Sequence, residues 1–361
     1  MANTMPKIEV IFKQLAASAV ARSAQGIAVL IVLDDTDDSF DILTLTSITD
    51  LDPTLFTAGN VANIKDALAG VPSKLIVVRV DTDSATVVND AIAALGITKY
   101  NWIGLVGGDN GDQTDLSTFI KGREAAGETK KAIVFNVTAP DSQHVVNFAT
   151  SNIVYADGRT ATGDVFIPRL LGLLSGIEVT LAQSATYKAF PELLSVTDQS
   201  NNDSAVAAGK LFLFNDEGTV RLSTAVNSLT TFTGDKTEDM SSILITESMD
   251  MIKTDIQATF KDSYLAKYKN KYDNQVLLIS AINSYFNDLV IADILDDSFD
   301  NQAGVDIEAQ RNAWLSIGKT EAAIWTDSQV KNNSFKRSVF LNADIKILDA
   351  MENFKFSVAL Q

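Results

Sequence analysis

The sequence predicts a mixed α/β and α+β protein, in which a mostly parallel α/β region precedes a helical C-terminal region. Three observations predict this fold class. Strand-like and helix-like segments alternate between about residues 27 and 155, and apolar residues take a helical spacing from about residue 241. Both ends of the chain show the period-two pattern that is typical of strands. With 361 residues, the chain is long enough for two or three domains.

Four apolar runs, rich in valine and isoleucine, predict strands that are buried on both faces, as in a parallel sheet. Helical patterns lie between them, and this alternation predicts crossover helices on the sheet. The predicted strands are Ile27–Leu33, Leu75–Val80, Trp102–Val106 and Ala132–Val137, with a candidate fifth at Asn152–Tyr155, and the predicted helices are Val61–Ala69, Thr86–Leu95 and Leu116–Ala126.

The middle of the chain, from about residue 160 to 240, is less regular. Pro168 is placed for the first position of an apolar helix over Arg169–Leu174, which Gly176 would close. The segment Asn215–Gly218 is a turn signal between two strand-like runs, so it predicts a hairpin. These runs are Lys210–Phe214 and Thr219–Leu222.

From residue 241 the sequence predicts helices. Apolar and aromatic residues recur every four positions and predict one amphipathic helix with a core-facing stripe. Its members are Ile252, Ile256, Phe260, Tyr264 and Tyr268. A second helix is predicted over Asn274–Leu289, apolar around much of its circumference and therefore buried, and a third from Asp306 towards Leu315.

The composition excludes several kinds of chemistry. The chain has no cysteine and one histidine, so it has no disulfide, no thiol nucleophile and no metal site built on two histidines. The 29 basic and 46 acidic residues give a net charge of −17, which argues against broad binding to nucleic acid or anionic membranes. A secretory pattern and an apolar run of ~20 residues are both missing from the sequence, so we expect a soluble protein made in a cytoplasm.

Two glycine-containing segments resemble phosphate-binding loops only in part. Gly318-Lys319-Thr320 matches the end of such a loop, but Ala313 stands where the first glycine is required, so the segment predicts a helix end. Gly107–Gly111 follows a strand, but its glycine spacing is wrong and acidic residues adjoin it. It predicts a plain turn, with Asp112 or Thr114 capping the next helix.

The remaining polar clusters also lack a complete site. Asp296, Ser298 and Asp300 have the spacing of a calcium loop, but its glycine and its final glutamate are replaced by Asn301 and Ile307. His144 is predicted at the exposed start of a short helix, without a nucleophile beside it. We therefore predict no catalytic residue, no metal site and no cofactor.

Several stretches resemble, in the expected order, the contractile tail sheath proteins of bacteriophages and phage-tail-like bacteriocins. Near the start these are Met5–Lys13 and Arg22–Gly26, and later come Asn274–Asn283, Trp314–Trp325 and Leu348–Phe356. The resemblance is clearest over residues 241–361 and the first thirty residues.

The resemblance implies a structural subunit and not an enzyme. Such subunits polymerise as stacked hexameric rings around a tail tube, and they contract to drive the tube through the envelope of the target cell. The implied partners are further copies of the chain, the tail tube protein, and the baseplate and tail terminator proteins, with no nucleic acid and no direct membrane insertion. The implied location is a phage virion tail or bacteriocin particle that is assembled in the bacterial cytoplasm.

In that family, terminal arms leave their own subunit and add strands to neighbouring subunits. The period-two ends of this chain are candidates for these arms, because their apolar faces need partners. The predicted exchange residues are Ile8, Val10 and Phe12 in the N-terminal arm and Phe354, Phe356, Val358 and Leu360 in the C-terminal arm. The predicted receiving strand carries Val339, Leu341, Ala343, Ile345 and Ile347.

The expected organisation has five segments. They are an N-terminal arm (1–26), an outer α/β domain (27–160), a connecting mixed segment (161–240), a tube-facing C-terminal sheath domain (241–349) and a C-terminal strand-exchange arm (350–361). The outward placement of the α/β domain follows from its larger acidic excess. Two alternatives stay open, namely the sheath of a related contractile injection or secretion system and a soluble α/β enzyme.

Overall fold

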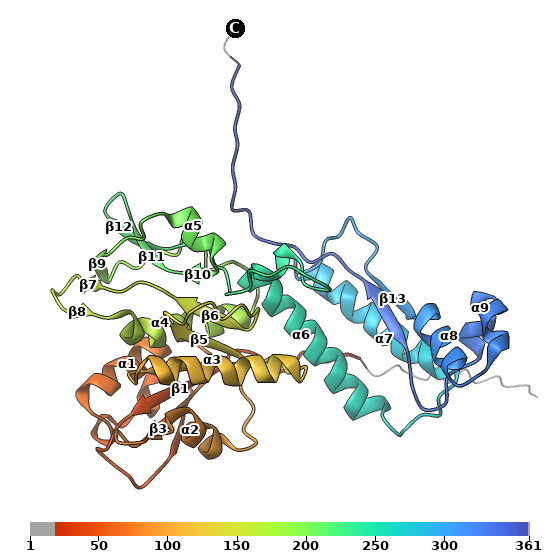
Figure 1. Cartoon of the computed structure of the whole chain (residues 1–361), viewed down its shortest axis with the longest axis horizontal. Coiled ribbons are helices and arrows are strands. Elements are labelled where there is room, and N and C mark those ends of the chain that lie inside the picture. Colours follow the sequence, from red (N-terminus) through yellow and green to blue (C-terminus); the bar gives the residue numbers. More distant parts are fainter. Residues whose placement is uncertain (1–18, 360–361) are drawn as a thin grey trace, which may run out of the picture. The chain divides into compact units, whose positions relative to one another are not determined.

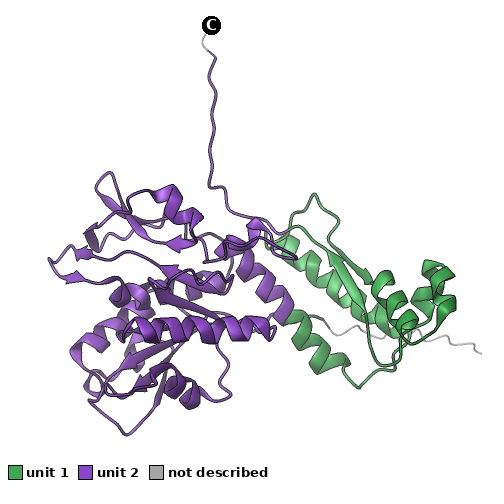
Figure 2. Cartoon of the chain, in the orientation of Figure 1, with its two compact units in different colours: residues 1–21, 255–346 green, residues 22–254, 347–361 purple. Residues whose placement is uncertain are grey.

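The computed structural model describes residues 19–359, which form two compact units (Figure 2). The first, here called the α/β unit, comprises residues 22–254 together with the C-terminal segment from Ile347. The second, the C-terminal unit, contains residues 255–346. The boundary between them falls inside helix α6 (Ile243–Thr259), so this helix belongs to both.

A largely parallel seven-stranded sheet is the centre of the α/β unit (Figure 1). Its strand order is β10-β6-β5-β4-β1-β3-β2, and only the edge strand β2 is antiparallel to its neighbour. The predicted strands and crossover helices of this region are confirmed, whereas β2 and β6 are not in the prediction, and β10 is the first part of the predicted strand-like run Lys210–Phe214. The strands are β1 (Ile27–Leu33), β2 (Ile42–Leu45), β3 (Lys74–Val80), β4 (Trp102–Val106), β5 (Lys131–Phe135), β6 (Val145–Phe148) and β10 (Lys210–Leu211).

Helices cover both faces of this sheet, which explains the continuous apolar runs of its strands. Along β1, Ala28 and Leu30 enter the core on the side of α1 and α4, whereas Val29 and Ile31 enter the core on the side of α2 and α3. All four side chains are fully buried. The helices are α1 (Ala58–Leu68), α2 (Val87–Leu95), α3 (Asn110–Ala125) and α4 (Gly163–Glu178).

Two smaller antiparallel sheets complete the α/β unit. The candidate fifth strand is real but lies outside the parallel sheet, as the middle strand of a three-stranded one. The predicted hairpin is confirmed, with its turn at Glu217 and Gly218, whose φ angles are both positive (47° and 86°). The elements are β7 (Ile153–Tyr155), β8 (Thr160–Ala161), β9 (Leu193–Val196), α5 (Asn202–Ala207), β11 (Leu213–Asp216) and β12 (Thr219–Leu222).

Three local predictions in this unit need correction. Helix α4 begins at Gly163, so Pro168 lies inside the helix instead of at its first position. Asp109 is the N-cap residue of α3 and accepts hydrogen bonds from the Gly111 and Asp112 amides, whereas the predicted Asp112 completes a capping box by accepting one from the Asp109 amide. His144 is not at the exposed start of a helix. It lies directly before β6 and is buried, and its ring is enclosed by the ionisable side chains described below.

The C-terminal unit is helical, with one two-stranded sheet. The single long helix expected from the four-residue stripe ends early, since α6 changes to a π-helical turn at Phe260–Tyr264 and Ala266 takes a positive φ of 60°. Helix α7 buries one face, from Gln275 to Leu289, whereas Val276 and Ile291 are exposed. The remaining elements are α7 (Tyr272–Ile291), β13 (Gln302–Val305), α8 (Ile307–Ser316), α9 (Asp327–Asn332) and β14 (Leu341–Asp344).

The α8 prediction is confirmed, since Asp306 caps this helix, and Gly318 follows its end with a positive φ of 86°. Short 3₁₀ turns lie at Ile48–Asp50, Pro53–Leu55, Glu238–Ser241 and Thr320–Ile324. Over residues 19–359, each helix is either too short or too polar to cross a bilayer.

Candidate functional site

Residues 351–359 form an exposed segment with an apolar face. Phe354, Phe356 and Val358 are 89%, 74% and 67% exposed, and the described part of this segment, residues 351–359, contains no helix or strand. The two phenylalanine rings stack on each other, with 6.2 Å between their centroids. Because alternate residues share one face of an extended chain, this segment presents an uncovered apolar edge.

Polar contacts hold the base of this segment on the α/β unit. The Glu352 carboxylate accepts hydrogen bonds from the hydroxyls of Thr186, at 2.6 Å, and Ser184, at 3.2 Å. Ser242, just before α6, donates a hydrogen bond to Asp349 at 3.3 Å. The exposed residues therefore follow directly after an anchored stretch.

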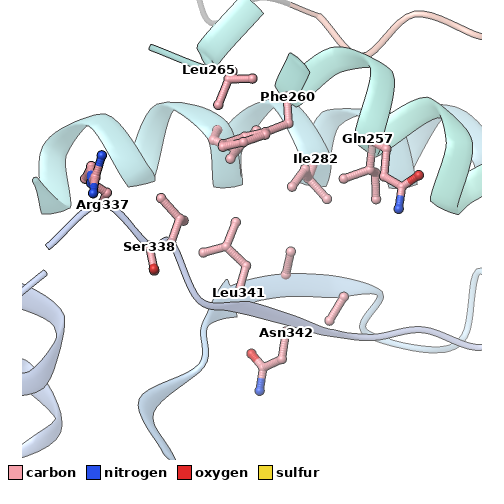
Figure 3. A pocket seen from close by; sticks show the side chains of 13 residues that line it. Gln257, Phe260, Leu265, Ile282, Arg337, Ser338, Leu341 and Asn342 are labelled. Atoms are coloured by element: carbon pink, nitrogen blue, oxygen red, sulfur yellow. The ribbon is translucent and has the colours of Figure 1, made fainter. Parts of the chain in front are cut away.

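An apolar groove lies within the C-terminal unit, between α6, α7 and β14 (Figure 3). It has a cavity volume of about 770 Å³. Figure 3 shows Leu341 directed towards the helices that carry Phe260 and Ile282, while Asn342 points to the other side. Further apolar lining comes from Ile256, Leu265, Leu278, Ala303, Val339 and Ala343.

Strand β14 forms one wall of this groove. It pairs antiparallel with β13, with Leu341 opposite Val305, in a sheet of two strands. Among the described residues the other edge of β14 has no strand beside it, so its main-chain groups remain available for pairing. A strand added there would place alternate side chains towards the groove.

A salt bridge fixes the end of this strand. Lys346 Nζ is 2.7 Å from Asp296 Oδ2, and the Lys346 amide donates a hydrogen bond to Asn301. The contact with Lys346 and a hydrogen bond from Ser298 lower the pKa of Asp296 to about 2. The acidic loop that resembles part of a calcium site thus holds β14 in place.

The residues of the predicted receiving strand fall into two groups. Val339, Leu341 and Ala343 line the groove, as their alternate spacing predicts. Strand β14 is shorter than the predicted run and ends at Asp344, so Ile345 and Ile347 follow it, and Ile347 is part of the α/β unit. The predicted arm residues Ile8, Val10, Phe12 and Leu360 lie outside the described residues.

The opposite wall of the groove was not identified from the sequence as a site. Ile256 and Phe260 belong to the four-residue stripe, which was interpreted as core alone, and Leu278 and Ile282 belong to α7. The sequence does contain a signal for this wall, because the segment Asn274–Leu289 is apolar around much of its circumference and such a helix needs neighbours on more than one side. The groove supplies an open place for one such neighbour.

Residues 19–359 contain no group of three or more histidine or carboxylate side chains placed to hold a metal ion. At the carboxyl end of β1, the side chain of the buried Asp34 is hydrogen-bonded to other groups of the same chain. Its oxygens accept hydrogen bonds from Thr36, Thr57 and Asn60. This end of the sheet therefore holds a structural carboxylate.

Comparison with known proteins gives a consistent result. Residues 235–361 match the family described as phage tail sheath C-terminal domain. The chain is 31% identical over 364 residues to a tail sheath protein of Clostridium phage phiCD119, and the match covers 98% of each protein.

Solved structures with the same fold extend over most of the chain. A sheath tail protein of Desulfitobacterium hafniense has a TM-score of 0.66 and 17% identity, covering 83% of this chain and 94% of that one. The helical sheath of the anti-feeding prophage, in its contracted state, has a TM-score of 0.70 and 10% identity, covering 99% of both chains. At these identities the likeness is one of fold.

Proposed function

The chain belongs to the phage tail sheath protein family and is a structural tail sheath protein, and from this premise we propose how it assembles. Copies form hexameric rings that stack into a helical sheath around a tail tube. Contraction of this sheath drives the tube through the envelope of the target cell. The sheath meets baseplate proteins at one end and a tail terminator at the other, in a phage virion tail or a bacteriocin particle.

The observation that carries this proposal is the exposed apolar face of Phe354, Phe356 and Val358. An isolated chain gains nothing from this face, but a neighbouring copy can cover it. In the proposed contact, this segment pairs with the free edge of β14 on another copy and places its apolar side chains in the groove. Contacts of this head-to-tail kind generate rings and helical polymers.

The size of the effect makes each single arm a weak link. Each apolar side chain of this size contributes roughly 1.5–3 kcal/mol when it is fully buried. Ordering the segment costs about 1–2 kcal/mol per residue and offsets most or all of this gain. A single arm is therefore a weak tether, and several arms per subunit make the polymer strong. The N-terminal residues Ile8, Val10 and Phe12 are proposed to add a second strand.

The same fold is compatible with a sheath of a contractile injection system, since the anti-feeding prophage sheath shares it. The tube-facing position of the C-terminal unit and the outward position of the α/β region are parts of the proposal. The proposed arms would be the same in a phage-type tail and in a contractile injection system.

Electron microscopy of the purified full-length chain by negative staining tests the proposal. We expect hollow tubes or ring stacks for the wild type and none after deletion of residues 350–361. The truncated chain should stay folded, because residues 351–359 are exposed. The double variant Phe354→Ser and Phe356→Ser should lose the tubes as well.

A matched control changes the other face of the same segment. The double variant Lys355→Gln and Ser357→Asn keeps the apolar side chains, and we expect it to form tubes. Tubes from the truncated chain would show that this segment does not link the subunits.

A further inference from the structure

A buried cation lies inside the α/β unit, among three carboxyl groups. Lys131 of β5 is 2% exposed, and its Nζ is 3.0 Å from Glu247, 3.3 Å from Asp250 and 3.5 Å from Glu178. The two helices that supply these groups are α6, with Glu247 and Asp250, and α4, with Glu178. The ammonium group therefore joins a strand of the sheet to both helices.

A second layer of ionisable groups surrounds Asp250. His144 Nε2 lies 3.0 Å from Asp250 Oδ2, and its Nδ1 is 3.8 Å from Glu124 of α3. Glu124 in turn forms a salt bridge of 2.7 Å with Lys236. These groups, together with the three carboxyls, are the charged and titratable side chains that face Glu247 and its partners. We call Lys131, Glu178, Glu247, Asp250 and His144 the Lys131 cluster.

The charges of this cluster are unequal if all its carboxyls are ionised. One ammonium faces three carboxyl groups, and an uncompensated buried charge costs several kcal/mol. Burial and the nearby Glu178 carboxylate raise the pKa of Glu247 well above its ordinary value. Burial also acts to raise the pKa of Asp250, but Lys131 and His144 outweigh this effect and lower it.

The geometry agrees with a neutral Glu247. Neither of its oxygens makes a well-directed hydrogen bond within the described residues, although Oε2 is close to Lys131. Asp250, by contrast, receives hydrogen bonds from both Lys131 and His144. Glu247 is thus the carboxyl of the cluster that receives the fewest hydrogen bonds from the described residues, and burial favours its neutral form.

The cluster lies where the chain enters and leaves this unit. Glu178 Oε2 accepts a hydrogen bond of 3.1 Å from the Gly26 amide, close to residue 22, where the unit begins. Glu247 and Asp250 lie in the first half of α6, shortly before Thr254, where the unit's part of that helix ends. One buried group of charges thus holds both ends of the unit's main segment.

We propose that the Lys131 cluster is a proton-dependent anchor, which fixes the first half of α6 to the sheet while its carboxyl groups share one proton and loosens α6 when that proton is lost. This inference goes beyond the assembly proposed above, and it is testable on a single copy of the chain. Because the folded pKa of Glu247 is raised, its contribution to stability is present below the unfolded pKa and lost as the pH rises through the folded pKa.

Hydrogen exchange of the full-length chain tests this anchor. Protection of the α6 amides 243–254, corrected for the intrinsic rate at each pH, is measured from about pH 6 to about pH 9. We expect wild-type protection to fall with rising pH, by up to about tenfold per pH unit between the ordinary pKa of a glutamate and the raised pKa of Glu247 in the folded chain, and to level off above that raised pKa. Protection that stays constant over this range would overturn the proposal.

The variant Glu247→Gln cannot gain or lose a proton in this pH range, but it keeps the shape of the side chain. We expect its α6 protection to be independent of pH and higher than that of the wild type at the alkaline end. Glu238→Gln, at an exposed site just before α6, should follow the wild-type profile. A decline in Glu247→Gln as steep as in the wild type would also overturn the proposal, and the wild-type profile decides the matter if that variant does not fold.

Discussion

The carboxylate of Glu352 and the hydroxyl of Thr186 are joined by a hydrogen bond of 2.6 Å, which ties the base of the exposed C-terminal segment to the α/β unit. Thr186 is itself fixed, because its hydroxyl accepts a hydrogen bond from the Ala225 amide. The direction in which Phe354 and the following residues leave the unit therefore depends on a few side-chain contacts, of which this is the shortest.

We expect Glu352→Ala to release this base. A hydrogen bond to a charged group contributes about 1.5–3 kcal/mol, less at an exposed site, so exchange of the amides near residue 352 should be severalfold faster. Tubes should grow more slowly, since each arm must find its neighbour from a wider range of positions. Glu352→Gln keeps an acceptor oxygen and should restore part of the rate. Equal growth of wild type and Glu352→Ala would show that the anchor has no role in assembly.

The groove on the C-terminal unit should be needed for assembly and not for folding. Leu341→Asp places a charge where the arm of another copy is proposed to bind, so tubes should be lost while the circular dichroism spectrum is retained. Asn342→Asp adds the same charge to the next residue, whose side chain points away from the helices, and it should leave the tubes intact. If both variants formed tubes, the groove would not be the receiving surface.

Close packing of α4 on α1 should make one glycine essential to the α/β unit. A Cβ at Gly172 would lie 1.9 Å from the Ala67 carbonyl oxygen, which is backbone and has no way to move aside. We expect Gly172→Ala to lower the free energy of unfolding by about 3 kcal/mol or more, as measured by urea denaturation.

The control for this substitution is Gly122→Ala, in α3. A Cβ there would meet no atom within 4 Å, so the variant should be neutral or more stable by up to about 1 kcal/mol. Equal effects of the two substitutions would mean that the helix contact does not limit the stability of the unit.

Asp34 should contribute to stability at neutral pH and lose that contribution in acid. Burial by itself raises the pKa of its carboxyl, but hydrogen bonds from Thr36, Asn60 and Thr57 outweigh burial and hold the pKa below the ordinary range. A lowered folded pKa gives stability that is present above the unfolded value and lost as the pH falls through the folded value.

We expect Asp34→Asn to cost about 1–3 kcal/mol at neutral pH, because an amide nitrogen would face the donors, and to reduce the loss of stability in acid. Urea unfolding at about pH 7 and about pH 2.5, below the unfolded pKa of an aspartate, measures both effects. Asp38→Asn, at an exposed position of the same loop, should leave both unchanged. An unaltered pH dependence in Asp34→Asn would contradict the assignment.

The sequence by itself determined the parallel sheet, its crossover helices, the α8 helix and the alternation of apolar residues near the C-terminus. These features depend on local patterns, namely continuous apolar strands such as Ile27–Leu33, helical periodicity and alternate apolar residues such as Phe354 and Phe356. The family resemblance was also present in short stretches of sequence, and the comparison with the phiCD119 protein confirms it.

Only the tertiary structure decided which residues meet across long separations in the chain. Lys131 and Glu247 lie far apart in sequence, and nothing near His144 indicates that Asp250 will cover it. The groove likewise combines α6, α7 and β14, and the π-helical turn at Phe260–Tyr264 helps to shape it. Local periodicity records which side of an element avoids water, whereas its partner is fixed by the packing of the whole unit.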